Sequence, residues 1–517
     1  MRSFLRFAAS ALTAIAIAPA LTAQTPTPTL TPERELTLQE CVTRALEKNF
    51  DVSMQRFTAE SAKSDVEIAK AAYDPTFTGS TSKSYTKSAP DVTTSYSLDE
   101  NGNVITTARS TSTKVDSEAT SLSVSQKIAT GATVTAGGDL DRSKRIPTTS
   151  TGINPAYLGD VSLRVSQPLL KGAGFGVNRA AIDRAKIGVE RASYDLKSTV
   201  LTVVRNVEAA YYNVAFSREQ REVRRFSLEV AQKLLDENKA RRSTGVATDL
   251  DVLQSEVNVA TAQRNLVLAE QSLRNAEDSL LQLIGQFEFD QKIGAVSMPD
   301  ATFPEVSFDK SYKLARENTP EFLSSQRYID QLKLDIKLAK DKKLPDVALG
   351  GGVGYSSKER SYTDASREVW AGKGYNWQVD LSVSVPWKFR AADASYRQVQ
   401  LALNREQAHL QQIDQSILVD VRTAVRSVET NVETVRLSQL STELSRKQFE
   451  QEKARYEAGL STFRFVQQSQ ATYDDARVSE LQARVNLRVA LADLARLEGS
   501  SLARYNVTLA AAAPAKP

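Results

Sequence analysis

An internal duplication constrains the fold of this 517-residue chain more than any other feature. In the first part of each half, a shift of 270 residues places Ala45 on Ala315 and needs no gap across a whole helical segment. Further along, a shift of 214 residues places Gly245 on Gly459. Other matched pairs are Glu47 with Glu317, Lys63 with Lys333, Asp65 with Asp335, Pro75 with Pro345, Thr248 with Thr462, and Gly285 with Gly499. The two halves therefore share one plan, and the first half is longer between its matched helices.

That plan is a helix, β-strands, a very long helix, a glycine-marked turn and a long returning helix. Residues 36–73 are predicted to be helical, and Pro75 ends this helix just before β-type sequence. Residues ~178–243 form one predicted helix of roughly 65 residues, about 100 Å long at about 1.5 Å per residue. Its partner in the second half is predicted at ~391–457. A single globular domain has no use for helices this long, whereas a coiled-coil wall does.

The long helices carry apolar seams with alternating steps of three and four residues. On the first returning helix the seam is Val259, Ala262, Leu266, Ala269, Leu273, Ala276 and Leu280. On the second it is Tyr473, Ala476, Glu480, Ala483, Leu487, Ala490 and Leu494, with Glu480 the one misfit. On the first outgoing helix it is Val200, Val203, Val207, Ala210 and Val214. Such seams pack helix against helix, and an ordinary soluble coiled coil explains them as well.

Between the helices the apolar period changes to about 2, which is the strand period. Val379, Leu381 and Val383 alternate with polar residues. The second half supplies two predicted strands, and the first half supplies two or four. The Ser/Thr/Asp-rich segment Ser88–Asp116 follows the first of them, and we predict it to be an extracellular loop. The strands are predicted at ~346–356, ~376–385, ~76–86 and ~160–168, with a further candidate hairpin at ~118–128 and ~131–141. Alternation over ~9–11 residues is typical of membrane strands, although half-buried soluble sheets alternate too.

The small number of strands has a consequence if they span a membrane. Four to six strands cannot close a barrel, because the smallest outer-membrane barrels have about eight. Open strand edges cannot face lipid, so the barrel must be shared between subunits. The expected fold class is mainly α with a membrane β portion: a duplicated long-helix coiled coil (an α-barrel) plus strands that contribute to a shared β-barrel.

The N-terminus indicates export. Residues 1–23 have a basic start at Arg2 and Arg6, an apolar stretch and small-residue cleavage sites, as in a secretory signal peptide. No later stretch approaches the ~18–20 apolar residues of a membrane helix. The predicted domain boundaries are a signal peptide at 1–23, a linker at 24–35, a first repeat at 36–285, a linker at 286–306, a second repeat at 307–499 and a tail at 500–517.

Composition argues against several other functions. The chain has 66 basic and 62 acidic residues, and cleavage removes two arginines, so a nucleic-acid partner is not expected. The only cysteine, Cys41, cannot form an intrachain disulfide, and the only histidine, His409, lies on a polar helix. We find no metal-ligand cluster, phosphate-binding loop or nucleophile motif, so we expect no catalytic residues, no cofactor and no metal.

The order of elements and several local phrases resemble the TolC family of outer-membrane efflux channels. The phrases are Leu36–Glu40 with Arg44–Asn49, the strand-to-helix junction Val165–Leu170, and Arg455–Thr462. The resemblance covers roughly residues 36–499 and implies a homotrimer with one shared β-barrel in the outer membrane and a helical tunnel across the periplasm. It also implies a periplasmic adaptor (membrane fusion) protein and an inner-membrane pump as partners, besides the outer-membrane lipid.

The expected function is therefore the outer-membrane channel of a tripartite efflux or type I secretion system. The alternative is a secreted periplasmic coiled-coil scaffold, which explains the helices but leaves the alternating strands without a role. The sequence does not indicate the transported substrate or the class of pump.

The resemblance also places a constriction at the periplasmic ends of the helices. The predicted adaptor-docking turns contain Gly245, Val246, Gly459, Leu460 and Thr462. Family members can carry two aspartates three residues apart just after the second turn, but here Phe465 and Gln468 stand at those positions. The predicted gate residues are accordingly Asp249, Asp251, Arg464, Phe465 and Gln468, with a possible Arg464–Asp251 ion pair. The alternatives are a plain helical hairpin and, for Phe465, packing between neighbouring helices.

Overall fold

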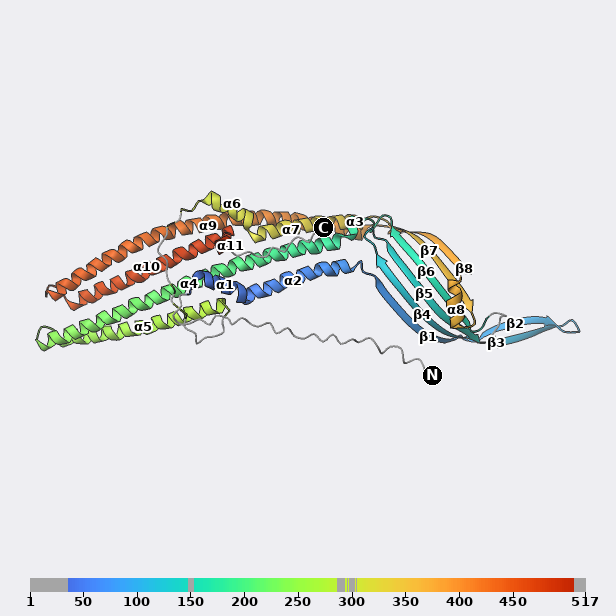
Figure 1. Cartoon of the computed structure of the whole chain (residues 1–517), viewed down its shortest axis with the longest axis horizontal. Helices are drawn as coiled ribbons and strands as arrows, with labels where there is room; N and C mark the ends of the chain where they lie inside the picture. The colour runs from blue at the N-terminus through green and yellow to red at the C-terminus, as the bar shows by residue number, and fades with distance from the viewer. Residues whose placement is uncertain are drawn as a thin grey trace.

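The computed structural model describes residues 36–146, 153–285, 293–294, 296, 303 and 305–505. The predicted signal peptide (1–23) and linker (24–35) lie outside these residues, as do most of the linker at 286–306 and residues 506–517 of the tail. The molecule is elongated (Figure 1). Long helices make up one end, a curved sheet makes up the other, and a thin ribbon of two strands projects beyond the sheet.

Six helices form a wall that is four helices wide. Their bounds are α2 Phe50–Ala71, α4 Ala180–Ser243, α5 Asp249–Leu283, α7 Pro320–Asp341, α9 Arg390–Glu457 and α10 Phe463–Glu498. Near the sheet, α4 packs against α2 and α7, and α7 packs against α9. Towards the other end, α4 packs against α5 and α10, and α10 packs against α9. The described helices include none that is both long and apolar enough to span a membrane.

The helical wall confirms the predicted long helices and their seams. Helix α4 has 64 residues and α9 has 68. The seam of α4 is buried at Val200, Val203, Val207 and Val214, which lie in one apolar cluster with Leu273, Ala276 and Leu280 of α5. The misfit in the α10 seam, Glu480, is half-buried and forms an ion pair of 2.6 Å with Arg484 one turn later.

The segment 36–73 is not one helix, as predicted, but two. Helix α1 covers Leu38–Lys48 and α2 begins at Phe50, with Asn49 between them in an extended conformation. The Asn49 side chain accepts hydrogen bonds from the backbone N–H groups of Asp51 and Val52, and its amide donates to the carbonyl of Leu283 at 3.0 Å. Asn49 thus provides the N-cap of α2 and ties it to the end of α5, which helical periodicity alone could not reveal.

The same junction occurs in both halves of the chain. Where α5 ends, Gly285 adopts φ 72°, and a Cβ there would lie 2.6 Å from the carbonyl oxygen of Lys48. Where α10 ends, Gly499 adopts φ 71°, and a Cβ would lie 2.8 Å from the Cβ of Asn318. Short helices flank the junctions: α6 is Phe308–Asn318 and α11 is Ser501–Arg504. At each junction the glycine lets the chain turn away at the end of one helix. The helix that continues the same position of the wall can then begin close to that end.

One antiparallel sheet of six strands follows the order β1-β4-β5-β6-β7-β8. The strands are β1 Thr76–Lys87, β4 Lys114–Lys127, β5 Thr133–Ile146, β6 Ala156–Pro168, β7 Asp346–Glu359 and β8 Gly374–Ser384. The first half therefore contributes four strands, including the candidate hairpin, and the second half contributes two. Helix α3, Phe175–Asn178, precedes α4 after the last strand of the first half. Strands β1 and β8 form the two edges of the sheet.

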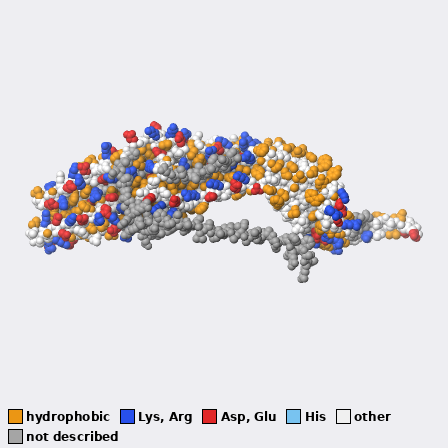
Figure 2. Space-filling view, viewed as in Figure 1, with side chains coloured by type: hydrophobic (Ala, Val, Ile, Leu, Met, Phe, Trp, Pro, Cys, Tyr) orange, Lys and Arg blue, Asp and Glu red, His pale blue; other side chains and the backbone are white. Residues whose placement is uncertain are grey.

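The two faces of the sheet differ in polarity, as the alternation predicts. Trp377, Val379 and Leu381 on β8 lie on one face and are exposed. Figure 2 shows hydrophobic side chains concentrated over the sheet, whereas charged side chains cover the helices and gather again where the sheet meets the ribbon. On the other face, Arg164 of β6 forms an ion pair with Asp380 of β8 at 3.0 Å.

The segment Ser88–Asp116 is not an irregular loop. Within it, β2 Asp91–Leu98 and β3 Val104–Thr111 pair as an antiparallel ribbon. A hydrogen bond of 2.8 Å from the Ser88 N–H to the Thr113 carbonyl joins the ribbon to the β1–β4 pair. The Thr, Val, Ile and Tyr residues of these two strands have high β propensity, which the polar composition of the segment conceals.

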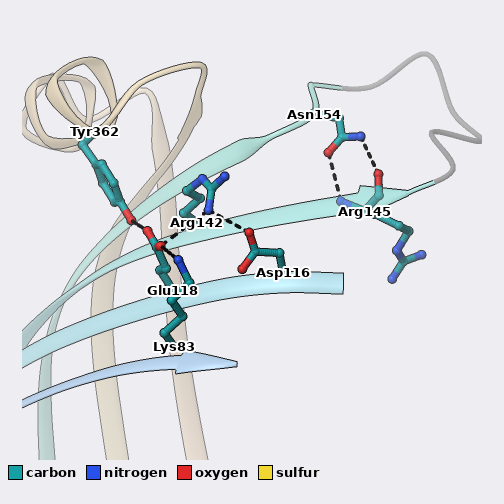
Figure 3. A network of polar contacts seen from close by, with 7 residues as sticks. All are labelled: Lys83, Asp116, Glu118, Arg142, Arg145, Asn154 and Tyr362. Atoms are coloured by element: carbon teal, nitrogen blue, oxygen red, sulfur yellow. Dashed lines mark hydrogen bonds and ion pairs between the residues drawn. The ribbon is translucent and has the colours of Figure 1, made fainter. Parts of the chain in front are cut away.

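A polar network marks the end of the apolar face, beside the ribbon (Figure 3). Lys83 of β1 pairs with Glu118 of β4 at 2.7 Å, and Arg142 of β5 pairs with Asp116 at 3.3 Å. Helix α8, Tyr362–Trp370, joins this network because the Tyr362 hydroxyl donates to Glu118 at 3.2 Å. The network connects three strands to α8 at the boundary between the apolar face and the charged rim.

The junction glycines give a test of the fold. Replacing Gly285 by Ala combines a left-handed φ with a collision against the Lys48 carbonyl, so we expect a loss of at least about 3 kcal/mol. Gly245→Ala is the matched control, because Gly245 has φ 77° but open space around its Cβ position, and only about 1–2 kcal/mol should be lost. Thermal unfolding followed by circular dichroism measures both. Equal losses in the two variants would contradict the close packing at Gly285.

Candidate functional site

The two helical hairpins reverse direction at the same end of the molecule, farthest from the sheet (Figure 1). We use the word tip for the turns Thr244–Thr248 and Ala458–Thr462 together with the first two turns of α5 and α10 that follow them. Gly245 and Gly459 have φ values of 77° and 74°. In each turn the residue after the glycine donates its N–H to a carbonyl five residues earlier, at 2.9 Å in the first and 2.8 Å in the second. This is the hydrogen bonding of a helix that ends on a left-handed glycine, as the sequence predicts.

The acidic residues of the first turn have partners close by. Asp251 and Thr248 form a capping box, in which the Thr248 N–H donates to the Asp251 carboxylate at 2.9 Å. The hydrogen bonds from the Thr248 side chain and backbone lower the pKa of Asp251. Asp249 pairs with Arg242 at 2.5 Å. Among the described residues Arg464 forms no ion pair, so the Arg464–Asp251 pair is absent from the single chain. Both hydrogen bonds from Thr248 go to one oxygen of the Asp251 carboxylate, Oδ2.

Several predicted tip residues present apolar side chains to the surroundings. Val246 is 74% exposed and Leu460, its counterpart in the second half, is 73% exposed. Phe465 is 55% exposed, so it does not fill a space between helices of its own chain. Gln468 is exposed, and Thr462 provides no side-chain cap. The side chains at the tip are therefore available to a partner or to the axis of an assembly.

The aromatic residue that packs inside the tip is Phe463, which is 3% exposed. It lies in an apolar cluster with Leu234 of α4, Phe449 and Tyr456 of α9, and Val466 of α10. The sequence analysis overlooked Phe463 in favour of Phe465. The spacing of Phe463, Val466 and Gln470 by three and four residues is the signal that could have identified the buried face of α10.

A buried chain of hydrogen bonds connects the two hairpins just above the tip. The Tyr456 hydroxyl of α9 donates to the side-chain oxygen of Asn238 on α4 at 2.5 Å. The Asn238 amide in turn donates to Ser255 on α5 at 2.7 Å. The guanidinium of Arg241 lies 4.3 Å from the centre of the Tyr456 ring, and burial raises the pKa of Tyr456. We call these three hydrogen-bonded residues the tip node, which no sequence pattern indicated.

Higher on the same helices, polar side chains of α10 face α4. Gln470 and Asp474 are buried, and the Gln470 amide donates to the Ser227 carbonyl of α4 at 3.4 Å. Burial is the main cause that raises the pKa of Asp474. The Gln470 side-chain oxygen and the Asp474 Oδ1 have no hydrogen-bond partner among the described residues. The hairpins are therefore held by a satisfied polar node at the tip and by a less satisfied polar contact above it.

The tip combines exposed apolar side chains with short polar contacts close by. Across the described residues, no group of three or more His, Cys, Asp or Glu side chains is placed to hold a metal ion. His409 is exposed on α9 and lies near Gln412 of the same helix, with 3.5 Å between Nδ1 and Oε1. The arrangement is two hairpins joined by buried polar and apolar contacts, with exposed apolar residues at their ends.

Comparison with known proteins agrees with this architecture. A family model described as "Outer membrane efflux protein" matches residues 133–286 and 311–500. The chain is 24% identical over 337 residues to the pyoverdine export outer membrane protein OpmQ of Pseudomonas aeruginosa, with 64% of this chain and 69% of that protein covered. It is 21% identical over 369 residues to the outer membrane protein TolC of Vibrio cholerae, with 71% and 81% covered.

Solved structures show the same fold. The Campylobacter jejuni CmeC outer membrane channel has a TM-score of 0.64 and 17% identity, with 90% of this chain and 86% of that chain covered. The open state of the Neisseria gonorrhoeae MtrE outer membrane channel has a TM-score of 0.59 and 15% identity, with 91% and 94% covered. Both likenesses extend over helices and sheet together.

The tip node gives a test of how the hairpins are joined. Tyr456→Phe removes only the hydroxyl, so the buried side-chain oxygen of Asn238 loses its donor, at a cost of about 1–3 kcal/mol. We expect faster hydrogen exchange at the ends of α9 and α10 and a lower midpoint of thermal unfolding. Tyr473→Phe is the control, because Tyr473 stacks on Phe449 through its ring and should lose little. Unchanged exchange at the tip in Tyr456→Phe would contradict a joining role for the node.

Proposed function

Because the chain belongs to the outer membrane efflux protein family, we propose that three copies form a passive exit duct across the periplasm and the outer membrane. The chain is an outer-membrane protein whose helices extend into the periplasm. The family members are channels rather than enzymes. The apolar face of the sheet is the observation that carries the proposal, because it is exposed in one chain and suited to lipid.

The edges of the sheet support a shared barrel. Strands β1 and β8 each lack a neighbour on one side among the described strands. Six strands are fewer than the about eight of the smallest outer-membrane barrels, and bare edges cannot remain in lipid. Pairing β1 of one copy with β8 of the next satisfies both edges and closes a ring. The related channels act as trimers, and we propose the same number here.

The edges of the helical wall support the same closure. Towards the tip the wall runs in the order α5, α4, α10 and α9, so α5 and α9 are its outer helices. Both carry exposed apolar residues: Leu250, Leu253 and Val257 on α5, and Leu437, Leu440 and Leu444 on α9. Their spacing of three and four residues makes a continuous stripe on each helix. We propose that α9 of one copy packs against α5 of the next, which buries both stripes.

The duct is proposed to serve a tripartite efflux or type I secretion system. Its partners are a periplasmic adaptor protein and an inner-membrane pump, with the outer-membrane lipid around the sheet. The turns with Gly245, Val246, Gly459, Leu460 and Thr462 are the proposed adaptor-docking sites. Val246 and Leu460 support this role, because each is an exposed apolar side chain at the equivalent position of its turn.

The gate is proposed to lie at the tip, with Asp249, Asp251, Arg464, Phe465 and Gln468 near the axis. Phe465 supports an apolar constriction, because it is exposed in one chain beside an assembly axis that would bring three copies together. Arg242 offsets the charge of Asp249, whereas the hydrogen bonds from Thr248 favour the ionised form of Asp251 and lower its pKa. The repeat boundaries 36–285 and 307–499 are proposed as the units that each supply one hairpin.

Membrane location and assembly test the proposed function. The full-length protein should fractionate with the outer membrane and behave as a trimer in detergent. We expect Leu440→Asp to reduce the trimer to smaller species, because a charge would be placed in the α9–α5 contact. Ser441→Asp adds the same charge at the next exposed position and should leave the trimer largely intact. A soluble periplasmic product, or a trimer unaffected by Leu440→Asp, would favour a coiled-coil scaffold or a different interface.

The gate is tested by bilayer conductance of the purified trimer. Phe465→Ala removes the proposed apolar constriction, so the closed-state conductance should rise severalfold. Leu460→Ala is the matched control, since it removes a similar exposed apolar side chain from the docking turn. An unchanged closed-state conductance in Phe465→Ala, or an equal rise in Leu460→Ala, would show that Phe465 does not form the constriction.

A further inference from the structure

The contact between α10 and α4 above the tip has an unusual balance of hydrogen-bond donors and acceptors. At the tip node every side chain has a partner, because Tyr456 donates to Asn238 and Asn238 donates to Ser255. The upper contact lies near Asp474, about 16 Å along α10 from its first residue, at about 1.5 Å per residue. There two buried oxygens, the Gln470 side-chain oxygen and the Asp474 Oδ1, lack a donor among the described residues.

Gln470 and Asp474 are four residues apart, so they share one face of α10. That face is buried against α4, where Ser227 is the common neighbour of both side chains. The Gln470 side-chain oxygen and the Asp474 Oδ1 are both buried and have no donor among the described residues. Each unsatisfied buried acceptor destabilises the packed state, and the effect is larger for a charged group.

One proton on the Asp474 carboxyl would remove the buried charge and provide a missing hydrogen-bond donor. An ionised carboxylate only accepts, whereas a protonated carboxyl also donates one hydrogen bond. A proton on Asp474 removes the buried charge and supplies the donor that the Gln470 oxygen lacks. The two other donors of this contact are already used, because the Gln470 amide donates to the Ser227 carbonyl and the Ser227 hydroxyl donates to the Asp474 carboxylate.

We propose that Asp474 is protonated while α10 is packed against α4, and that it releases this proton when the two helices separate. Since this separation is how the tip of the proposed duct would open, the inference rests on the proposed function. Opening of each chain is then coupled to the release of one proton, so acidic surroundings favour the closed arrangement and alkaline surroundings favour the open one.

The neighbouring charges do not remove this effect. Arg224 of α4 lies 3.6 Å from Asp475, which is exposed and takes up part of its charge. Arg477 of α10 lies over the Tyr473 ring, 5.8 Å from its centre. Burial has the largest effect and raises the pKa of Asp474; the hydrogen bond from Ser227 and the two arginines lower it, Asp475 raises it, and the pKa is raised overall. A carboxyl with a raised pKa in the packed state stabilises that state at low pH, and this stabilisation is lost as the pH rises.

Distance measurements on the detergent-purified trimer test the proposal without any conductance. Spin labels placed at Gln232→Cys on α4 and Ala471→Cys on α10 are exposed and flank the contact. The natural Cys41 is buried, and burial raises its pKa to about 12, so it should remain unlabelled. We expect the distance between the labels to lengthen as the pH is raised from about 4 to about 8, above the ordinary carboxyl pKa.

Two variants separate Asp474 from its surroundings. Asp474→Asn keeps a donor for Gln470 and carries no charge, so the label distance should stay short at every pH. Asp475→Asn is the matched control at the adjacent exposed position, and it should keep the pH step, moved slightly lower because a like charge is removed. A pH step that persists in Asp474→Asn, or a wild-type distance that does not change with pH, would overturn the proposal.

Infrared spectroscopy provides a second readout in case a variant folds poorly. At each pH where the label distance is short, the unmodified protein should show the carbonyl band of a buried protonated carboxyl, and this band should disappear together with the short distance as the pH is raised. Absence of the band where the distance is short would also overturn the proposal. Loss of channel conductance with the pH step intact would count against the proposed duct alone.

Discussion

The packing of α4 against its neighbours is the interaction on which the rest of the structure depends. This helix contacts α2 and α5 of the first half and α7 and α10 of the second half, so it joins the two halves of the wall. Its buried face is made mainly of Val and Ala, which keep the helices close and the wall thin. The returning helices α5 and α10 lie on either side of this helix, which therefore sets their relative position and brings the two tip turns to the same level.

The second constraint on the fold is that two positions of the wall are each filled by two successive helices rather than by one continuous helix. Helices α2 and α5 occupy one position across the wall, and α7 and α10 occupy another, so each position requires a junction between two helix ends. Unsatisfied backbone groups at such ends must find partners. Asn49 satisfies the start of α2, and the left-handed glycines Gly285 and Gly499 let the chain leave without collision. The repetition of this solution in both halves explains why those glycines match at one shift.

Sequence periodicity predicted much of this fold, for physical reasons. The long helices, their seams and the strand alternation are periodic over many residues, so a few exceptions do not hide them. The break at Asn49 and the ribbon β2–β3 were not predicted, because each depends on a single cap or on contacts that polar composition conceals. At the tip, the turn glycines were predicted from their backbone requirement. Phe463, Asn238 and Asp474 were missed, since a buried polar or aromatic role depends on which helix lies opposite.

The bare strands β1 and β8 have a further consequence for how the protein is made. A newly exported copy must pass through water with two unpaired edges and one broad apolar face, and such edges readily join the wrong strand. The helical arm already has extensive contacts within a single chain. In the proposed assembly the sheet is completed only when other copies arrive, so the yield of folded protein should depend steeply on local concentration. Under that proposal, meeting other copies is a step in folding itself and not only in assembly.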